Sequence, residues 1–267
     1  MLDEFQIRED IVECGRRLYQ KGFVASNDGN ITVKIGDDEI LATPTGRSKG
    51  FLQTDELVKL NYKGDVLEGN SKPSTEILMH LAIYEERPDV RAVVHAHPIY
   101  ATGFATANIP LADCVLAEIV TTLGSIPIAP YATPSTPELA DSIRNIIRHA
   151  DACLLANHGV VTCGRNVFDA YYKMERVEHY AHIIYVAKML GGERVLNPDE
   201  VQKLYKIRET YGTQSHANPG CLACTEDCVG GDCVLYEKKI KTYDGGNSTD
   251  EARLSSLVGD IIRTLNY

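Results

Sequence analysis

The sequence lacks any long apolar run and has no basic N-terminal start. No apolar stretch approaches the length of about 18 residues that a membrane-spanning helix needs. The first residues, Met1 to Glu4, carry two acidic side chains and lack the positive charge and apolar core of a signal peptide. We therefore expect an intracellular, cytoplasmic protein with no membrane partner.

Basic residues are also scarce. The chain of 267 residues has 27 Lys and Arg against 37 Asp and Glu, which gives a net charge of −10. A nucleic-acid-binding surface needs clustered Lys and Arg, so nucleic acid is not an expected partner. Any anionic substrate must be held by local donors, because the overall field of the protein opposes it.

The eight cysteines do not predict a disulfide framework. Four stand among apolar neighbours, as buried thiols of a reducing compartment do: Cys14, Cys114, Cys153 and Cys163. Four more lie close together near the C-terminus: Cys221, Cys224, Cys228 and Cys233. This second group predicts either a metal or iron–sulfur site or an oxidation-prone linker, and its spacing matches no single standard pattern.

The length and the hydrophobic content of 44% predict one domain of about 200 residues with an extension. Helical periodicity is clearest over residues 3–21, 167–190 and 199–211. Strands are expected at 31–35, 39–42 and 90–97, and a short hairpin at 55–68. This mixture of helices and hairpins agrees with a layered α/β domain.

Two histidines, separated by one residue, lie at the end of one expected apolar strand. His95 and His97 are two residues apart, so both imidazoles point to the same face of an extended strand. Catalytic zinc takes three protein ligands and leaves one position open, and His158 at the end of another apolar strand is the candidate third ligand. A His-x-His pair alone is a weak signal, but His158 and the preceding Glu76 strengthen it.

Polar segments that can bind an anion accompany the histidines. Residues 25–30 and 43–46 are loops whose backbone N–H groups can converge on one anion. Ser74 and Thr75 precede an apolar helix, where hydroxyls and the positive helix end favour negative charge. Ordinary turns and an N-cap at Ser74 are the simpler explanations, but beside the histidines we favour a phosphate site.

Five short motifs occur in an order that resembles the class II aldolase/adducin family. They are residues 26–30, 43–46, 73–76, 95–98 and 157–159. The resemblance covers about residues 5 to 212 and is greatest to the zinc-dependent enzymes that cleave L-fuculose 1-phosphate. It implies a single class II aldolase-type α/β domain over residues 1–215, with a mostly antiparallel central sheet flanked by helices.

The resemblance also implies a site. Zn²⁺, one per subunit, would be held by His95, His97 and His158, and Glu76 would move the substrate proton. The phosphate of a small sugar substrate would be held by Gly29, Asn30, Thr45, Gly46, Ser74 and Thr75. Tyr211 aligns with a tyrosine that reaches a neighbouring active site, and a homotetramer is expected.

The implied activity is cleavage of L-fuculose 1-phosphate, or a related ketose 1-phosphate, to dihydroxyacetone phosphate and an aldehyde such as L-lactaldehyde. Alternatives within the family are a 5-deoxyribulose- or methylthioribulose-phosphate aldolase or dehydratase, a pentulose-phosphate 4-epimerase and a decarboxylase. An adducin-like interaction domain is the alternative that is not an enzyme. A second family tyrosine has no match here: Cys114 stands nearest, and Glu118 is a further candidate carboxylate.

The C-terminal extension divides into three parts. Residues 216–240 are rich in cysteine, 241–250 form a polar linker, and 251–267 are expected to form an amphipathic helix. Such a helix is marginal alone and needs a partner surface. It either docks on its own protein or, as its resemblance to encapsulation peptides indicates, binds a shell protein of a bacterial microcompartment.

Overall fold

The computed structural model describes residues 3–210. One eight-stranded sheet runs through the domain in the order β4-β3-β2-β1-β5-β8-β7-β6. The strands are β1 (Asn30–Lys34), β2 (Ile40–Ala42), β3 (Val58–Leu60), β4 (Val66–Glu68), β5 (Ala92–Ala96), β6 (Ile128–Ala129), β7 (Ala152–Leu155) and β8 (Gly159–Gly164). Every adjacent pair is antiparallel except β6 and β7, which confirms the expected mostly antiparallel sheet.

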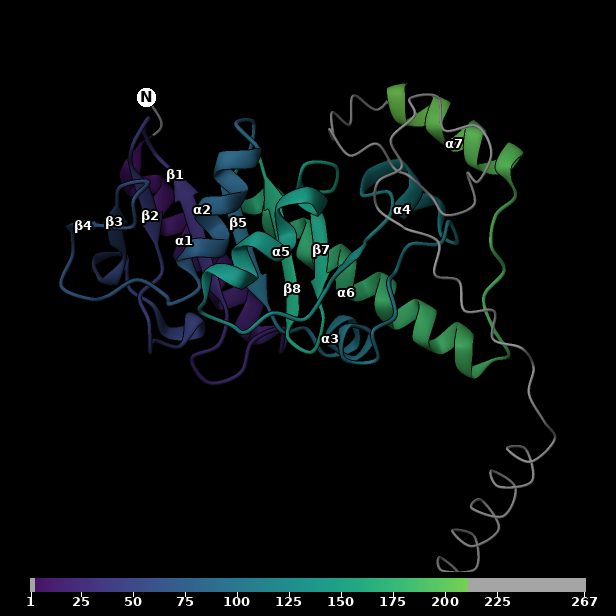
Figure 1. Ribbon diagram of the computed structural model, residues 1–267, viewed down its shortest axis with the longest axis horizontal. Coiled ribbons are helices and arrows are strands. Elements are labelled where there is room, and N and C mark those ends of the chain that lie inside the picture. The colour runs from purple at the N-terminus through teal and green to yellow at the C-terminus, as the bar shows by residue number, and fades with distance from the viewer. Residues whose placement is uncertain (1–2, 211–267) are drawn as a thin grey trace, which may run out of the picture. The chain divides into compact units, whose positions relative to one another are not determined.

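Helices cover both faces of this sheet (Figure 1). They are α1 (Glu4–Gln20), α2 (Ile77–Glu86), α3 (Ile99–Thr106), α4 (Ala117–Thr122), α5 (Pro137–Ile147), α6 (Val167–Met189) and α7 (Pro198–Thr210). Two short 3₁₀ turns, η1 (Lys49–Phe51) and η2 (Thr54–Glu56), lie beside α1. The main core joins α1, α3 and α6 to one face of the sheet, and α2 packs against α5.

Strand alternation decides which side chains enter each layer. Ala92 and Val94 of β5 belong to the core beneath α6, whereas His95 points to the other face, toward α2. The first helix shows the matching helical pattern: Ile7, Ile11 and Leu18 are buried on one side. Strand β5, which carries His95, is therefore central in the sheet and covered on both faces.

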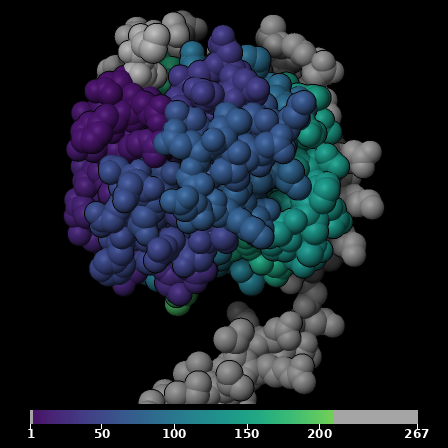
Figure 2. Space-filling view, turned by 90° about the vertical axis from the view of Figure 1, so that its left-hand side faces the viewer, coloured from purple at the N-terminus to yellow at the C-terminus, as the bar shows by residue number. Residues whose placement is uncertain are grey.

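The two ends of the sheet differ. β4 is an edge strand that pairs only with β3, and Figure 2 looks onto this end of the molecule, where N-terminal segments make up most of the surface. Val66 and Leu67 are exposed there. The short length of β4, three residues, limits the unpaired edge that another chain could extend.

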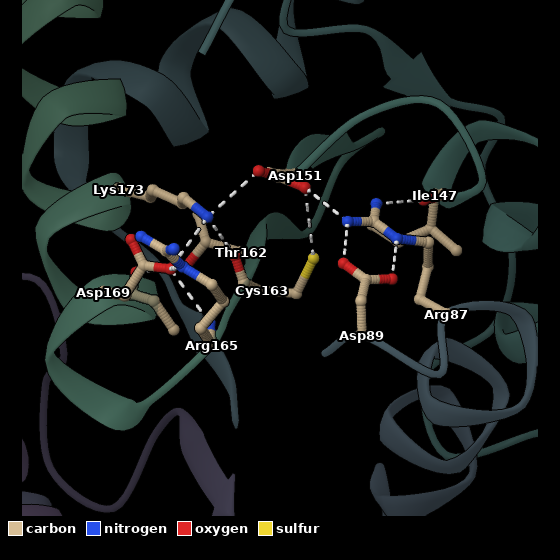
Figure 3. A network of polar contacts seen from close by, with 10 residues as sticks. Arg87, Asp89, Ile147, Asp151, Thr162, Cys163, Arg165, Asp169 and Lys173 are labelled. Atoms are coloured by element: carbon tan, nitrogen blue, oxygen red, sulfur yellow. Dashed lines mark hydrogen bonds and ion pairs between the residues drawn. The ribbon is translucent and has the colours of Figure 1, made fainter. Parts of the chain in front are cut away.

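A buried ion-pair network joins the residue after α2, the residue before β7 and helix α6 (Figure 3). Asp151 accepts hydrogen bonds from Arg87 at 2.9 Å and from Lys173 at 3.0 Å, and Asp89 also pairs with Arg87 at 2.8 Å. Removing one partner of a buried pair costs about 3–5 kcal/mol, because the other charge is left uncompensated. The network therefore stabilises one arrangement of the end of the sheet that lies opposite the histidines.

Local differences from the expected elements are few. Residues 117–122, for which the sequence pattern does not distinguish helix from strand, form α4. The helix expected to open near Ser74 begins at Ile77, and the Ser74 hydroxyl instead accepts from the backbone N–H of Glu76 in the preceding turn, at 3.3 Å. No described helix combines the length and the apolar character needed to cross a bilayer.

The scattered cysteines only partly match the expectation. Cys14, Cys153 and Cys163 are buried free thiols, and burial raises the pKa of each to about 12. Cys114 is buried but disulfide-bonded, so the expectation of a free thiol there is wrong. Apolar neighbours surround a buried thiol and a buried disulfide sulfur alike, and for this reason the sequence pattern did not separate them.

Candidate active site

Strand β5 places the first two histidines. His95 is fully buried and is paired in register with Asn30 of β1. His97 lies just beyond the strand, and its backbone N–H donates to the Phe23 carbonyl at 2.9 Å. Pro98 then precedes α3, so the chain leaves the sheet immediately after the second imidazole. Alternation along an extended strand brings both rings to the same side.

The β7–β8 hairpin places the third histidine. Asn157 occupies the left-handed region at φ 56°, a conformation that Asn tolerates better than most side chains. His158 follows it, and its backbone N–H donates to Leu155 at 3.0 Å. Gly159 comes next because no side chain fits: a Cβ there would lie 2.5 Å from His97 Cδ2 and 2.7 Å from the Ala96 carbonyl oxygen.

These elements bring the three predicted histidines together. Their candidate ligand atoms all lie within 4.8 Å of one another, and Nε2 of His95 is 3.1 Å from Nε2 of His97. Two nitrogens bound to one tetrahedral zinc at the usual bond length would be about 3.3 Å apart. The donor set of three imidazoles, with a fourth position open, therefore fits a catalytic zinc ion.

Polar neighbours orient two of these rings. His95 Nδ1 lies 2.9 Å from the Val160 carbonyl oxygen, which only accepts, so Nδ1 carries the proton and Nε2 is free to coordinate. His97 Nδ1 lies 3.5 Å from an Asp28 carboxylate oxygen. Burial lowers the pKa of both His95 and His97, which keeps the imidazoles neutral as metal binding requires.

Glu76 lies against this cluster. Its carboxylate oxygens are 3.0 Å from His158 Nε2 and 3.4 Å from His95 Nε2, and one of them accepts from Asn30 Nδ2 at 2.7 Å. Burial alone would raise the pKa of Glu76, but the adjacent His95 and His158 and the Asn30 hydrogen bond lower it below its usual range. The group is therefore an ionised carboxylate beside the three imidazoles.

A cavity of about 240 Å³ opens beside Glu76. It is lined by Asn27, Asp28, Gly29, Asn30, Pro44, Thr45, Gly46, Lys49, Ser74, Thr75, Glu76, His97 and His158. All six residues expected to hold phosphate are in this set. The two loops meet because β1 and β2 are antiparallel, so the start of one lies beside the end of the other.

Several donors of the expected phosphate site are already engaged. The backbone N–H of Thr45 donates to the Lys72 carbonyl at 2.9 Å, and Asn30 Nδ2 bonds Ser74 and Glu76. The Thr75 hydroxyl is 2.6 Å from that of Ser135. Gly46 faces open space, with φ +71°. Phosphate binding would thus rely on the backbone near Gly46 and on hydroxyls that can exchange partners.

The sequence motifs assigned no role to four of the lining residues, and two of these four are charged. Asp28 lies within a quoted motif but was given no role, and Lys49 follows the 43–46 loop closely enough to be a candidate. Conversely, Glu118 is exposed on α4 and is not among the described residues that line the cavity. Tyr211 and the cluster Cys221, Cys224, Cys228 and Cys233 lie outside the described residues.

Comparison with known proteins agrees with this geometry. The domain family described as Class II Aldolase and Adducin N-terminal domain matches residues 9–185. A 3-oxo-tetronate 4-phosphate decarboxylase of Haemophilus influenzae is 34% identical over 203 residues, which cover 74% of this chain and 95% of the relative. A 5-deoxy-D-ribulose 1-phosphate aldolase of Bacillus thuringiensis is 34% identical over 209 residues, covering 78% of this chain and 97% of the relative.

Solved structures show the same similarity. An L-fuculose 1-phosphate aldolase superposes with a TM-score of 0.71 at 30% sequence identity, covering 76% of this chain and 96% of that one. The expected fold and the expected class of enzyme, a class II aldolase, are both confirmed. The chain belongs to the class II aldolase and adducin family.

Proposed function

We propose that the protein is a zinc-dependent aldolase that cleaves L-fuculose 1-phosphate, or a closely related ketose 1-phosphate, to dihydroxyacetone phosphate and an aldehyde such as L-lactaldehyde. One observation carries the proposal: the Glu76 carboxylate lies between three converging imidazoles and a cavity of hydroxyl and backbone donors. When bound, zinc supplies a Lewis acid that polarises the substrate carbonyl and stabilises the developing enediolate charge.

The chain itself supplies orientation and proton transfer. Gly29, Gly46, Ser74 and Thr75 border the space for the phosphate and so set where the rest of the sugar lies. When the carbon–carbon bond breaks, its electron pair stays on the dihydroxyacetone phosphate fragment. The hydroxyl of the other fragment loses its proton as it becomes the aldehyde carbonyl, and Glu76, once it carries a proton, gives one to the carbon that received the electron pair. In the reverse direction the Glu76 carboxylate removes the same proton, and its lowered pKa keeps it in the ionised form that this step needs. Tyr211 would act at the aldehyde end.

A decarboxylase is the second candidate, favoured by the 34% identical relative of that name. Loss of carbon dioxide from a 3-oxo-tetronate 4-phosphate leaves the same enediolate of dihydroxyacetone phosphate. The two reactions therefore use the same phosphate and metal subsites and differ in the fragment that leaves. Residues 109–124 contain no tyrosine to serve the departing aldehyde, and this absence is compatible with either a different aldehyde or carbon dioxide.

The experiment that distinguishes the aldolase from the decarboxylase measures both products of the reaction. Purified protein with zinc is given L-fuculose 1-phosphate, 5-deoxyribulose 1-phosphate and 3-oxo-tetronate 4-phosphate in turn. Dihydroxyacetone phosphate is detected by a coupled dehydrogenase, and the second product is identified as an aldehyde or carbon dioxide. Aldehyde from a ketose phosphate supports the proposal, whereas carbon dioxide with inert ketose phosphates would replace it. Absence of both metal binding and turnover would favour an interaction domain.

We also propose a homotetramer, and a microcompartment shell protein as the partner of residues 251–267. The support is family resemblance and the apolar periodicity of that segment, which lies outside the described residues. Residues 241–267 fused to a fluorescent protein should form puncta in cells that make the cognate shell. Diffuse fluorescence there would remove this role.

A further inference from the structure

Lys49 is a buried lysine at the wall of the active-site cavity. The residue is 2% exposed, begins η1 and lines the cavity. Its backbone lies tightly against α1, where a Cβ on Gly15 would lie 2.6 Å from the Lys49 carbonyl oxygen. A glycine inside a helix costs about 0.5–1 kcal/mol relative to alanine, and here it permits this close approach. The backbone of Lys49 is therefore held in one position, and this position determines where its side chain begins.

The ammonium of Lys49 joins the two loops proposed to hold phosphate. Nζ donates to the Asn27 carbonyl at 2.9 Å and to the Arg47 carbonyl at 2.7 Å. An ammonium has three N–H donors, so one remains after these two bonds. Within residues 3–210 no acceptor for it lies within hydrogen-bond distance.

Lys49 is also the one cationic side chain among the described residues that line the cavity. Arg47, its neighbour in the loop, pairs with Glu56 at 3.1 Å and is mostly exposed. The lining carries two carboxylates, Asp28 and Glu76, in a protein with a net charge of −10. A phosphate dianion entering here would meet a repulsive field unless a positive group lay beside it.

We propose that Lys49 donates its remaining N–H to an oxygen of the substrate phosphate while holding the 25–29 and 44–48 loops in place. The inference rests on the proposed function, because it assumes that a phosphorylated substrate enters this cavity. The Lys49 ammonium would add a charged contact to the expected hydroxyl and backbone donors, and this contact would offset the negative charge of the phosphate. A hydrogen bond between charged groups is about twice as strong as one between neutral groups.

The binding test uses the full chain loaded with zinc, and glycerol 3-phosphate as the probe. Glycerol is the matched probe without phosphate, and titration calorimetry measures both. Lys49→Met retains the length and apolar stem of the side chain and removes its charge. We expect glycerol 3-phosphate to bind about 10–100-fold more weakly to Lys49→Met, from the usual strength of a hydrogen bond to a charged group. Lys63→Met, in the exposed turn before β4, is the control and should bind as the wild type does.

A pH profile separates charge from a purely structural role. Burial lowers the pKa of Lys49 to about 8, partly offset by Asp28 and Glu76, the charged groups that face it. The phosphate monoester is already dianionic well below this pH, since its second pKa is about 6. Wild-type affinity should therefore fall as the pH rises above 8, while the affinity of Lys49→Met should stay flat there. Lys49→Arg, which keeps a charge, should bind more tightly than Lys49→Met.

The outcomes distinguish this inference from the proposed function. Equal binding of glycerol 3-phosphate and glycerol by the wild type would overturn the phosphate site itself. Preference for glycerol 3-phosphate that Lys49→Met retains in full would overturn the role of Lys49 alone. If thermal unfolding shows that Lys49→Met is not folded, the wild-type pH profile and Lys49→Arg decide, and a flat wild-type profile above pH 8 counts against the inference.

Discussion

The carboxylate of Glu76 contacts several partners at once. His158 and His95 lie on its metal side, and Asn30 donates to it from β1. This arrangement fixes the carboxylate before a substrate arrives, which is the preorganisation that a general base needs. The partners come from β1, β5 and the β7–β8 turn, so substitutions at single residues should separate metal binding from proton transfer.

Glu76→Gln should reduce turnover by about 10²–10⁴-fold, the usual contribution of a general acid–base group. Glutamine keeps the shape and the Asn30 contact but cannot take the proton. Zinc content, measured on the same sample, should be unchanged because the three imidazoles remain. Glu68→Gln, at an exposed position on β4, is the control and should be fully active. A fully active Glu76→Gln enzyme would remove Glu76 from the mechanism.

Asp28→Asn should weaken zinc binding by about 10–100-fold, the usual effect of losing a partner that orients a histidine ligand. The Asp28 carboxylate lies 3.5 Å from His97 Nδ1, and the amide replacing it carries no charge to hold that proton. Competition with a chromogenic chelator measures the affinity. Asp37→Asn, in the exposed turn between β1 and β2, should leave it unchanged. Equal affinities for the two variants would count against this role.

The β7–β8 hairpin is tightly constrained by the strand beside it. It passes so close to β5 that Gly159 must be glycine, and the same turn carries His158. The left-handed Asn157 lets the chain reverse with only three residues between the strands. Packing between neighbouring strands therefore holds His158 against His95 and His97.

Gly159→Ala should both destabilise the fold and impair the metal site. The added methyl would need His97 to move, and overpacking of this kind costs about 1–3 kcal/mol. Denaturant unfolding measures the stability, and chelator competition measures the zinc affinity. Gly103→Ala in α3 is a matched control, because nothing lies within 4 Å of its added methyl. Equal effects of the two substitutions would contradict the argument from close approach.

Stability of the whole molecule should depend on pH through His80. This histidine is buried on α2, with Nδ1 2.8 Å from the Thr32 hydroxyl, which also bonds Tyr84. Burial lowers the pKa of His80 from 6.5 to about 4, with Glu76 opposing. Between pH 6.5 and about pH 4, His80 is protonated in the unfolded chain but neutral in the folded chain, so protonation favours unfolding.

The free energy of unfolding should therefore fall by up to about 3 kcal/mol through His80 as the pH decreases from 6.5 to 4. Urea unfolding at several pH values measures the slope. His80→Gln should show a shallower slope whatever its stability at neutral pH, because it has no proton to gain. Because a metal ion held by His95 and His97 would also be lost in acid, the comparison is made without zinc. Identical slopes in the two proteins would contradict a role for His80.

Metal binding by the cysteine-rich segment would change the metal content of the whole chain. If Cys221, Cys224, Cys228 and Cys233 bind a metal, protein purified without oxygen should contain more than one metal ion per chain. Deleting residues 221–233 should then reduce the content to the single ion of the histidine site. Elemental analysis of the two chains is the measurement. A content of one ion per chain in both would leave the segment as a linker.

Much of this protein follows from local sequence pattern. Apolar side chains at helical spacing placed α1 and α6, because burying one face of a helix depends on neighbours three and four residues away. Alternation and strand ends placed His95, His97 and His158, and the family motifs supplied Glu76. These features were predictable because each depends on a short stretch of chain.

Tertiary structure decided the contacts between segments distant in sequence. Lys49 meets the carbonyl of Asn27 because η1 packs on α1, and Asp28 meets His97 because β1 pairs with β5. Glu118, a carboxylate of equal promise in the sequence, ends exposed on α4. Hydrophobic periodicity tells which face of an element is buried, whereas sheet order and close packing determine which polar groups meet, and only the folded chain contains that information.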